Sequence, residues 1–171
     1  GFYGVYHGPE GIKNIANEVN KHTIQLAKSL EEKGFKVRTK HFFDTITIYS
    51  SENTDSLLEA ASQKGINLRK INKNYIGVSL DESVDEQVLK DILSVFSIKS
   101  VKELKEETSS IPKNLLRTSK YLQHPVFNTY RTETEMLRYI KRLYEKDIAL
   151  DRAMIPLGSC TMKLNSTSEM L

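Results

Sequence analysis

The residues that fix the fold most firmly are Ile66-Asn-Leu-Arg-Lys-Ile-Asn-Lys-Asn-Tyr-Ile-Gly-Val-Ser-Leu80. Two runs within them, 66–71 and 75–80, have the composition of β-strands and flank a short polar segment. That segment, Asn72-Lys-Asn74, is typical of a tight turn because asparagine tolerates positive φ. We therefore predict a β-hairpin here, and with it a sheet that is at least partly antiparallel.

Three helices are predicted around this hairpin. The first two are expected to end at Gly34 and Gly65, and the third to begin at a capping box, Ser83-Val-Asp-Glu86. The second helix is expected to start at Asn53 or Thr54. The apolar positions that recur at helical spacing are Ile12, Ile15, Ala16, Val19, Leu26, Ala27 and Leu30, then Leu57, Leu58 and Ala61, then Val84, Val88, Leu89, Ile92, Leu93 and Phe96.

One more strand completes the predicted domain. Residues 42–49 are rich in β-branched residues and predict a strand with Ile46 and Ile48 facing inward. The basic run from Lys36 to His41 is interpreted as a solvated edge strand. The predicted fold class is α+β: a small two-layer domain with helices on one face of a partly antiparallel sheet.

Different features follow this domain. A short helix is expected over 98–107, with Val101 and Leu104 inward. Residues 108–131 show little periodicity and contain two prolines, which predicts a linker. Thr132-Glu-Thr-Glu135 is a capping box and predicts a helix that runs to about Leu150. Its apolar side would be Met136, Ile140, Leu143, Tyr144 and Ile148.

The composition argues against several classes of function. The formal net charge of +3 comes from 25 basic and 22 acidic side chains that are scattered, whereas nucleic-acid binders concentrate their cations. No apolar run approaches the roughly 20 residues of a membrane span. The single cysteine, Cys160, and four histidines without zinc-ligand spacing predict neither a disulfide framework nor a metal site. A cytoplasmic protein without nucleic-acid or membrane partners is favoured.

One loop near the C-terminus carries reactive groups. Gly158-Ser-Cys-Thr-Met-Lys163 brings together a thiol, two hydroxyls and an ammonium group. Such a loop can bind a carboxylate or phosphate, and a nucleophilic cysteine would need a base or a helix start beside it. Taken alone, these residues favour an ordinary loop. Ser166-Thr-Ser-Glu169 then begins another helix just before the sequence ends, so the chain is expected to be a piece of a larger protein.

The other polar candidates favour structural roles. His7 precedes the long helix, whose first turn would contain Pro9 and Glu10. His124 is expected to pack on Tyr121 or Phe127. Arg131, Arg138 and Arg142 are expected on one helix, as a charged face or a docking surface.

Six strings resemble one enzyme family: Tyr6-His-Gly-Pro-Glu-Gly11, Phe42-Phe-Asp-Thr45, Gly77-Val-Ser-Leu-Asp-Glu82, His124-Pro-Val-Phe-Asn128, Thr132-Glu-Thr-Glu-Met-Leu-Arg-Tyr139 and Met154-Ile-Pro-Leu-Gly-Ser-Cys-Thr-Met-Lys-Leu-Asn165. In this order they are similar to the glycine dehydrogenase (decarboxylating) family, the P protein of the glycine cleavage system. The resemblance covers essentially Tyr3 to Leu171.

The resemblance implies a chain of two homologous halves, each with the fold of the aspartate-aminotransferase-like (fold type I) pyridoxal-phosphate enzymes. Residues 1–107 would be the small C-terminal domain of the first half and 108–131 a linker. Residues 132–171 would be the helix and truncated entry segment of the second half. The parent, dimeric or pseudo-dimeric, would release carbon dioxide from glycine and pass the aminomethyl group to the lipoyl arm of H protein.

By the same resemblance, the cofactor lysine lies beyond Leu171, so none of the lysines here, Lys163 included, is assigned that role. The piece itself is expected to be inactive and to bind no pyridoxal 5'-phosphate. Candidates to line the substrate channel of the intact enzyme are Ser159, Cys160, Thr161, Lys163 and Asn165.

Two other functions are compatible with the predicted fold. One is a stand-alone regulatory module that binds a small molecule, since strand-helix-strand-strand-helix units also build amino-acid sensors. The other is an RNA-binding sheet that uses Phe42, Phe43, Tyr49 and Tyr75, although the glycine-aromatic signature of such sheets is absent.

Overall fold

A computed structural model describes residues 1–50, 54–104 and 109–147 of the chain. The contacts divide it into two units, each of which is described by itself. We call Pro9–Tyr121 the sheet unit, and Gly1–Gly8 together with Leu122–Leu171 the terminal unit. Among the described helices, none is both long and apolar enough to span a membrane.

Ten elements follow one another within the described ranges. They are α1 (Phe2–Glu32), β1 (Lys36–Val37), β2 (Thr45–Tyr49), α2 (Thr54–Gln63), β3 (Arg69–Asn72), β4 (Tyr75–Ser79), α3 (Glu86–Val95), the 3₁₀ turns η1 (Lys113–Leu115) and η2 (Pro125–Asn128), and α4 (Glu133–Tyr144). The α1 segment is interrupted at Gly8, whose φ of 61° and ψ of −172° are not helical. Pro9 therefore opens the long helix of the sheet unit, as predicted.

The four strands form one sheet in the order β1-β2-β4-β3, and each neighbouring pair is antiparallel. The hairpin of β3 and β4 is confirmed, with Asn72 opposite Tyr75. The sequence predicted positive φ at the asparagines of the turn, and this is wrong. The Asn72 side-chain oxygen instead accepts a hydrogen bond from the Asn74 N–H at 2.9 Å. The basic edge strand is confirmed in part: β1 lies at one end of the sheet but comprises Lys36–Val37, and residues 38–41 are not in a strand.

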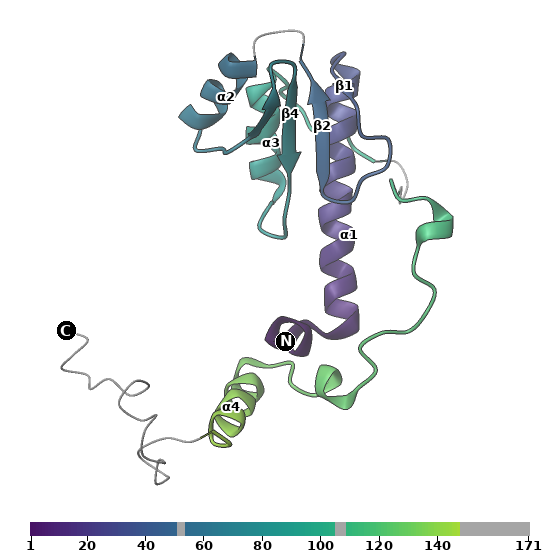
Figure 1. The fold of residues 1–171 in the computed structure, drawn as a ribbon, viewed down its shortest axis with the longest axis vertical. Coiled ribbons are helices and arrows are strands. Elements are labelled where there is room, and N and C mark those ends of the chain that lie inside the picture. Colours follow the sequence, from purple (N-terminus) through teal and green to yellow (C-terminus); the bar gives the residue numbers. More distant parts are fainter. Residues whose placement is uncertain (51–53, 105–108, 148–171) are drawn as a thin grey trace, which may run out of the picture. The chain divides into compact units, whose positions relative to one another are not determined.

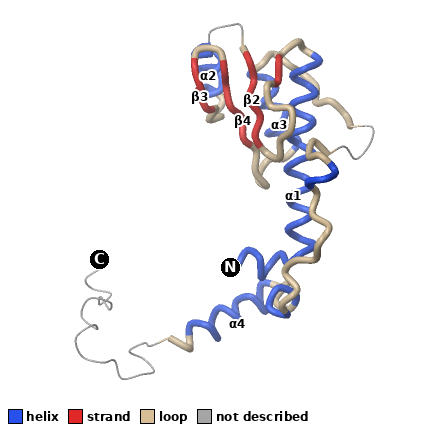
Figure 2. Tube along the Cα trace, turned by 45° about the vertical axis from the view of Figure 1, so that its right-hand side comes forward, coloured by secondary structure: helices blue, strands red, loops and turns tan. Residues whose placement is uncertain are grey.

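Three helices cover one face of this sheet (Figure 1, Figure 2). The inward side chains of the strands and the apolar stripes of the helices form a single cluster, which confirms the predicted α+β fold class. Its fully buried members include Leu26, Leu30, Ile46, Ile48, Ile76, Leu89 and Leu93. Burial of each such side chain contributes roughly 1.5–3 kcal/mol. Val88 does not belong to this core, contrary to the prediction, because it is 37% exposed.

The predicted start of α3 is wrong by two residues. The cap of α3 is Asp85, whose carboxylate accepts from the Val88 N–H at 2.8 Å. The Ser83 hydroxyl instead donates to Asp81 at 2.5 Å, so the predicted capping box at Ser83 does not form. Glu86 pairs with Lys90 along the exposed side of the helix at 2.7 Å.

The helix predicted over 98–107 is also wrong for the part that the structure describes, 98–104. Ser97 adopts a left-handed φ of 58°, which ends α3, and the chain then runs without helix. The N–H of Lys102 donates to the Ser29 hydroxyl at 2.9 Å. Hydrogen bonds to α1 therefore replace those of the expected helix, while Val101 still packs against the core.

The capping box that opens α4 is confirmed. The Thr132 hydroxyl accepts from the Glu135 N–H, and the Glu135 carboxylate accepts from the Thr132 N–H. The helix ends at Tyr144, earlier than the predicted Leu150, which lies outside the described residues. Lys146 and Asp147 donate to carbonyls three residues back, a tightened last turn that terminates the helix.

Candidate functional site

Three of the quoted strings meet in the terminal unit. They are the His7-Gly8 turn, the η2 turn with Phe127 and Asn128, and the start of α4 beside Arg131. Residues that are 124 positions apart in the sequence are hydrogen-bonded here. We call this meeting of the His7-Gly8 turn, η2 and the start of α4 the Arg131 joint.

Arg131 holds the joint together. Its guanidinium donates through Nη1 to the His7 carbonyl at 2.6 Å and through Nη2 to the Phe127 carbonyl at 2.7 Å. A longer contact of 3.3 Å joins Nη2 to the Asn128 side-chain oxygen. Such charge-assisted hydrogen bonds are shorter and stronger than neutral ones. Arg131 thus precedes α4 and fixes two turns, so the predicted place for it on the exposed face of a helix is wrong.

Gly8 makes room for this arginine. A Cβ built on Gly8 would lie 2.0 Å from Nη2 of Arg131, far inside van der Waals contact. The backbone of Gly8 also adopts positive φ with extended ψ, a region that essentially only glycine occupies. Both the missing side chain and the backbone freedom of glycine are used at this position.

Glu135 joins the same cluster from the first turn of α4. Its Oε2 accepts from the backbone N–H groups of Thr132 and Arg131, each at 3.2 Å, and from the Thr132 hydroxyl at 3.1 Å. The Thr132 N–H, then the Arg131 N–H and the Thr132 hydroxyl, hold the pKa of Glu135 below its ordinary value of 4.5.

The stability of the start of α4 should depend on pH. Because the pKa is lowered on folding, these hydrogen bonds stabilise the folded state above the unfolded-state pKa of about 4.5 and are lost as pH falls through the folded value. We expect the protection factors of the Thr132 and Glu135 amides, which are exchange rates relative to the intrinsic rate at each pH, to fall as pH drops below 4.5 through the folded-state pKa of Glu135. In Glu135→Gln this acid-dependent step should disappear; an identical pH profile in wild type and variant would contradict the assignment.

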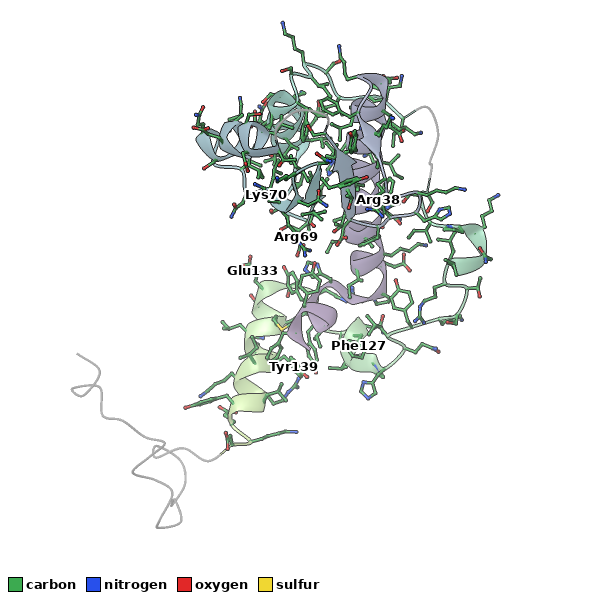
Figure 3. The ribbon with its side chains drawn as sticks, turned by 45° about the horizontal axis from the view of Figure 1, so that its top comes forward. Arg38, Arg69, Lys70, Phe127, Glu133 and Tyr139 are labelled. Carbon is green, nitrogen blue, oxygen red and sulfur yellow. The ribbon has the colours of Figure 1, made fainter. Side chains whose placement is uncertain are left out.

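Aromatic rings surround the other side of the helix start. Tyr130 and Tyr139 stack with centroids 4.3 Å apart, and the guanidinium carbon of Arg142 lies 5.2 Å from the Tyr130 ring centroid. Phe2 meets Tyr139 edge to face at 6.1 Å. Figure 3 labels Tyr139, Phe127 and Glu133 in this unit. A shallow cavity of about 210 Å³ lies beside these rings, with Arg138 and Glu135 at its rim.

The histidines of the joint have structural partners. The His7 ring lies 4.5 Å from the Tyr3 ring and 5.2 Å from the Tyr6 ring, measured between centroids. His124 caps η2, and its Nδ1 accepts from the Val126 N–H at 3.2 Å. The contacts seen for both histidines are structural: ring packing for His7 and capping of η2 for His124.

Comparison with known proteins identifies the family of the chain. The family described as glycine cleavage system P-protein matches residues 1–96. Glycine dehydrogenases (decarboxylating) of Pelagibacter ubique and Stutzerimonas stutzeri are each 48% identical to the chain over 171 and 178 residues, and that of Rhizobium etli is 50% identical over 169. The alignments cover 99–100% of this chain.

The chain belongs to the glycine cleavage system P-protein family. It spans 18% of the length of these relatives, so it corresponds to a limited part of each.

The substrate-channel candidates of this P-protein chain lie outside the described residues. Ser159, Cys160, Thr161, Lys163 and Asn165 all fall within 148–171. The joint around Arg131, in contrast, was not recognised from sequence. The available signal was the Gly8-Pro9 pair, which marks a turn, and an arginine directly before a capping box.

The described residues of the P-protein chain do not fit a site for pyridoxal phosphate. A lysine that forms a Schiff base is activated by desolvation or by a neighbouring cation, in a pocket that also orients the cofactor. Every lysine in the described ranges is exposed or half-buried. Lys28 and Lys40 line an open cavity of about 330 Å³ in the sheet unit, which leaves both amines accessible to water.

Proposed function

We propose that this chain is the part of a glycine dehydrogenase (decarboxylating) that connects its two aminotransferase-like halves. The observation that carries the proposal is identity of 48–50% along nearly the whole chain to proteins of that name. In this proposal residues 1–107 form the small C-terminal domain of the first half, 108–131 the linker, and 132–171 the entry to the second half.

The proposed parent enzyme removes the carboxyl group of glycine as carbon dioxide and transfers the aminomethyl group to the lipoyl arm of H protein. Pyridoxal phosphate, when bound elsewhere in the parent, supplies the electron sink for this reaction. The cytoplasmic location and the dimeric or pseudo-dimeric state expected from the sequence belong to the same proposal. The role of the described residues would be positional: the Arg131 joint fixes the His7-Gly8 turn and η2 beside the start of α4, from which the chain continues toward residues 154–165.

A direct test is a titration of the 171-residue chain with pyridoxal phosphate. We expect no Schiff-base absorbance band, because none of its lysines is assigned the cofactor role. A band that is lost on borohydride reduction and maps to one lysine of this chain would contradict the proposal. A regulatory module, the alternative function, would instead bind free amino acids with saturable heat in calorimetry.

Ser159 offers a test of the proposed substrate channel. We propose that the Ser159 and Thr161 hydroxyls support the glycine carboxylate or the cofactor phosphate in the intact enzyme. Loss of one hydrogen bond to a charged group costs about 1.5–3 kcal/mol, so Ser159→Ala in the intact enzyme should reduce kcat/KM for glycine about 10- to 100-fold. Thr161→Ser keeps a hydroxyl and is the matched control. Unchanged glycine affinity and turnover in Ser159→Ala would remove this role.

A further inference from the structure

The face of the sheet that points away from the three helices carries three cations that form no ion pair with any described residue, and Asp44 contributes a carboxylate at its edge through the Thr45 hydroxyl. We call this face the outer face. Lys36 lies opposite Tyr49, and the Arg38 N–H donates to the Thr47 carbonyl, so both cations share the face of Tyr49 and Thr47. Arg69 lies opposite Gly77 and joins them from β3.

The two faces of the sheet differ in their ion pairs. Arg69 and Lys70 are adjacent on β3 (Figure 3), and of the two only Lys70 has a carboxylate partner in the described part of the chain, Asp55 of α2. No ion pair among the described residues involves Lys36, Arg38 or Arg69. The sequences of the four described strands contain neither aspartate nor glutamate. The outer face therefore presents a net positive field to whatever approaches it.

Tyrosine rings and one aliphatic side chain lie between these cations. The Tyr49 and Tyr75 rings meet edge to face with centroids 5.5 Å apart, and the guanidinium carbon of Arg38 lies 5.2 Å from the Tyr75 centroid. Gly77 leaves space that Ile71 uses: the Ile71 Cδ1 lies 3.5 Å from where a Gly77 Cβ would be. Ile71 is 45% exposed despite this contact. Arginine and tyrosine are the residue types enriched at protein interfaces.

We infer that the outer face is a docking surface for an acidic segment of a separate protein. Charge complementarity indicates the chemistry of the partner, because three exposed cations without an ion-pair partner among the described residues are complementary to carboxylates. The polar character of the face indicates whether the contact is permanent or transient. Interfaces that stay closed permanently are mostly apolar, whereas this face offers one exposed aliphatic side chain among cations and hydroxyls. The contact is therefore one that forms and dissociates.

Nucleic acid would also be attracted by the charge, but the rings are poorly arranged for it. Bases are held by stacking on free aromatic faces. Here Arg38 lies over the ring of Tyr75, and Tyr49 presents its ring at 61° to that of Tyr75. A polypeptide carboxylate requires only the guanidinium and ammonium groups, which are exposed.

Two triple variants of equal charge test this inference. The outer-face triple reverses the charge of the three cations on that face: Lys36→Glu, Arg38→Glu and Arg69→Glu. The control triple reverses the charge of three exposed lysines of the sheet unit that lie outside the strands: Lys13→Glu, Lys64→Glu and Lys99→Glu. Each triple changes the formal net charge by three steps of −2, from +3 to −3. Binding of a labelled octaglutamate peptide to the 171-residue chain is measured by fluorescence anisotropy at low salt, with octauridylate RNA in parallel.

We expect octaglutamate to bind the wild-type chain, the outer-face triple to weaken that binding about tenfold, and the control triple to leave it within about twofold. Equal losses in both triples would show attraction by net charge alone and overturn the inference, as would no loss in either. Octauridylate binding that is tighter than octaglutamate binding and is lost in the outer-face triple would assign the surface to nucleic acid instead. Circular dichroism checks that each variant is folded. If the outer-face triple is unfolded, the milder pair Lys36→Gln and Arg69→Gln is used, and it should weaken octaglutamate binding about threefold. Unchanged binding in that pair would overturn the inference.

Because this surface lies on the sheet unit, its test does not depend on the proposed reaction. Failure of peptide binding would leave the decarboxylase assignment intact. Failure of decarboxylation in the parent would leave the docking surface intact.

Discussion

Gly8→Ala is expected to destabilise the terminal unit by about 2–4 kcal/mol. Alanine must adopt the φ of 61° and ψ of −172° that glycine occupies, which is strained for any residue with a Cβ. Its Cβ would also overlap the Arg131 guanidinium at 2.0 Å, so the arginine must move. Once it moves, the hydrogen bonds to the His7 and Phe127 carbonyls are lost together.

Hydrogen exchange with mass spectrometry measures this effect in peptides from 1–8 and 122–147. Gly4→Ala is the matched control, because Gly4 is helical and its Cβ would make an ordinary contact of 3.6 Å with the Phe127 ring. We expect faster exchange on both sides of the joint in Gly8→Ala and little change in Gly4→Ala. Equal protection in the two variants would show that Arg131 does not hold these turns together.

Leu93→Ala is expected to cost the sheet unit about 2–5 kcal/mol. Leu93 is fully buried in the cluster beneath the sheet, so its truncation removes buried methyl groups and leaves a cavity. Leu115→Ala makes the same chemical change at a side chain that is 69% exposed in the same unit, and it should cost little.

Urea unfolding monitored by far-ultraviolet circular dichroism compares these two variants. The midpoint should fall clearly for Leu93→Ala, with a similar dependence on urea, and remain close to wild type for Leu115→Ala. Similar midpoints for both variants would mean that the packing of α3 against the sheet does not stabilise this unit.

The core of this fold was predictable because its signals are periodic and local. Ile46 and Ile48 alternate with polar residues, and the stripe of Leu89, Ile92 and Leu93 recurs at helical spacing, so both faces were assigned correctly. The α3 cap was not, because Ser83 and Asp85 are both good capping residues. The choice is made by hydrogen bonding that the pattern does not contain: Asp81 takes the Ser83 hydroxyl and leaves Asp85 to cap the helix.

The joint could not be predicted for a different reason. Arg131 is fixed by carbonyls at His7 and Phe127, and no local pattern connects residue 131 with residue 7. The expected helix after Ile98 failed in a similar way, because the Ser29 hydroxyl of α1 takes the Lys102 N–H. The glycine and proline at 8–9 marked a turn correctly, but only the three-dimensional structure shows what the turn accommodates.

The central proposal is that this chain is part of a decarboxylase whose cofactor lysine lies in the rest of the parent. Release of labelled carbon dioxide from carboxyl-labelled glycine tests it most directly, with the intact parent and the 171-residue chain assayed side by side. Both assays contain pyridoxal phosphate and lipoylated H protein. We predict release by the parent and none by the chain alone; release by the chain, or a parent that is fully loaded with cofactor yet inactive, would contradict the account.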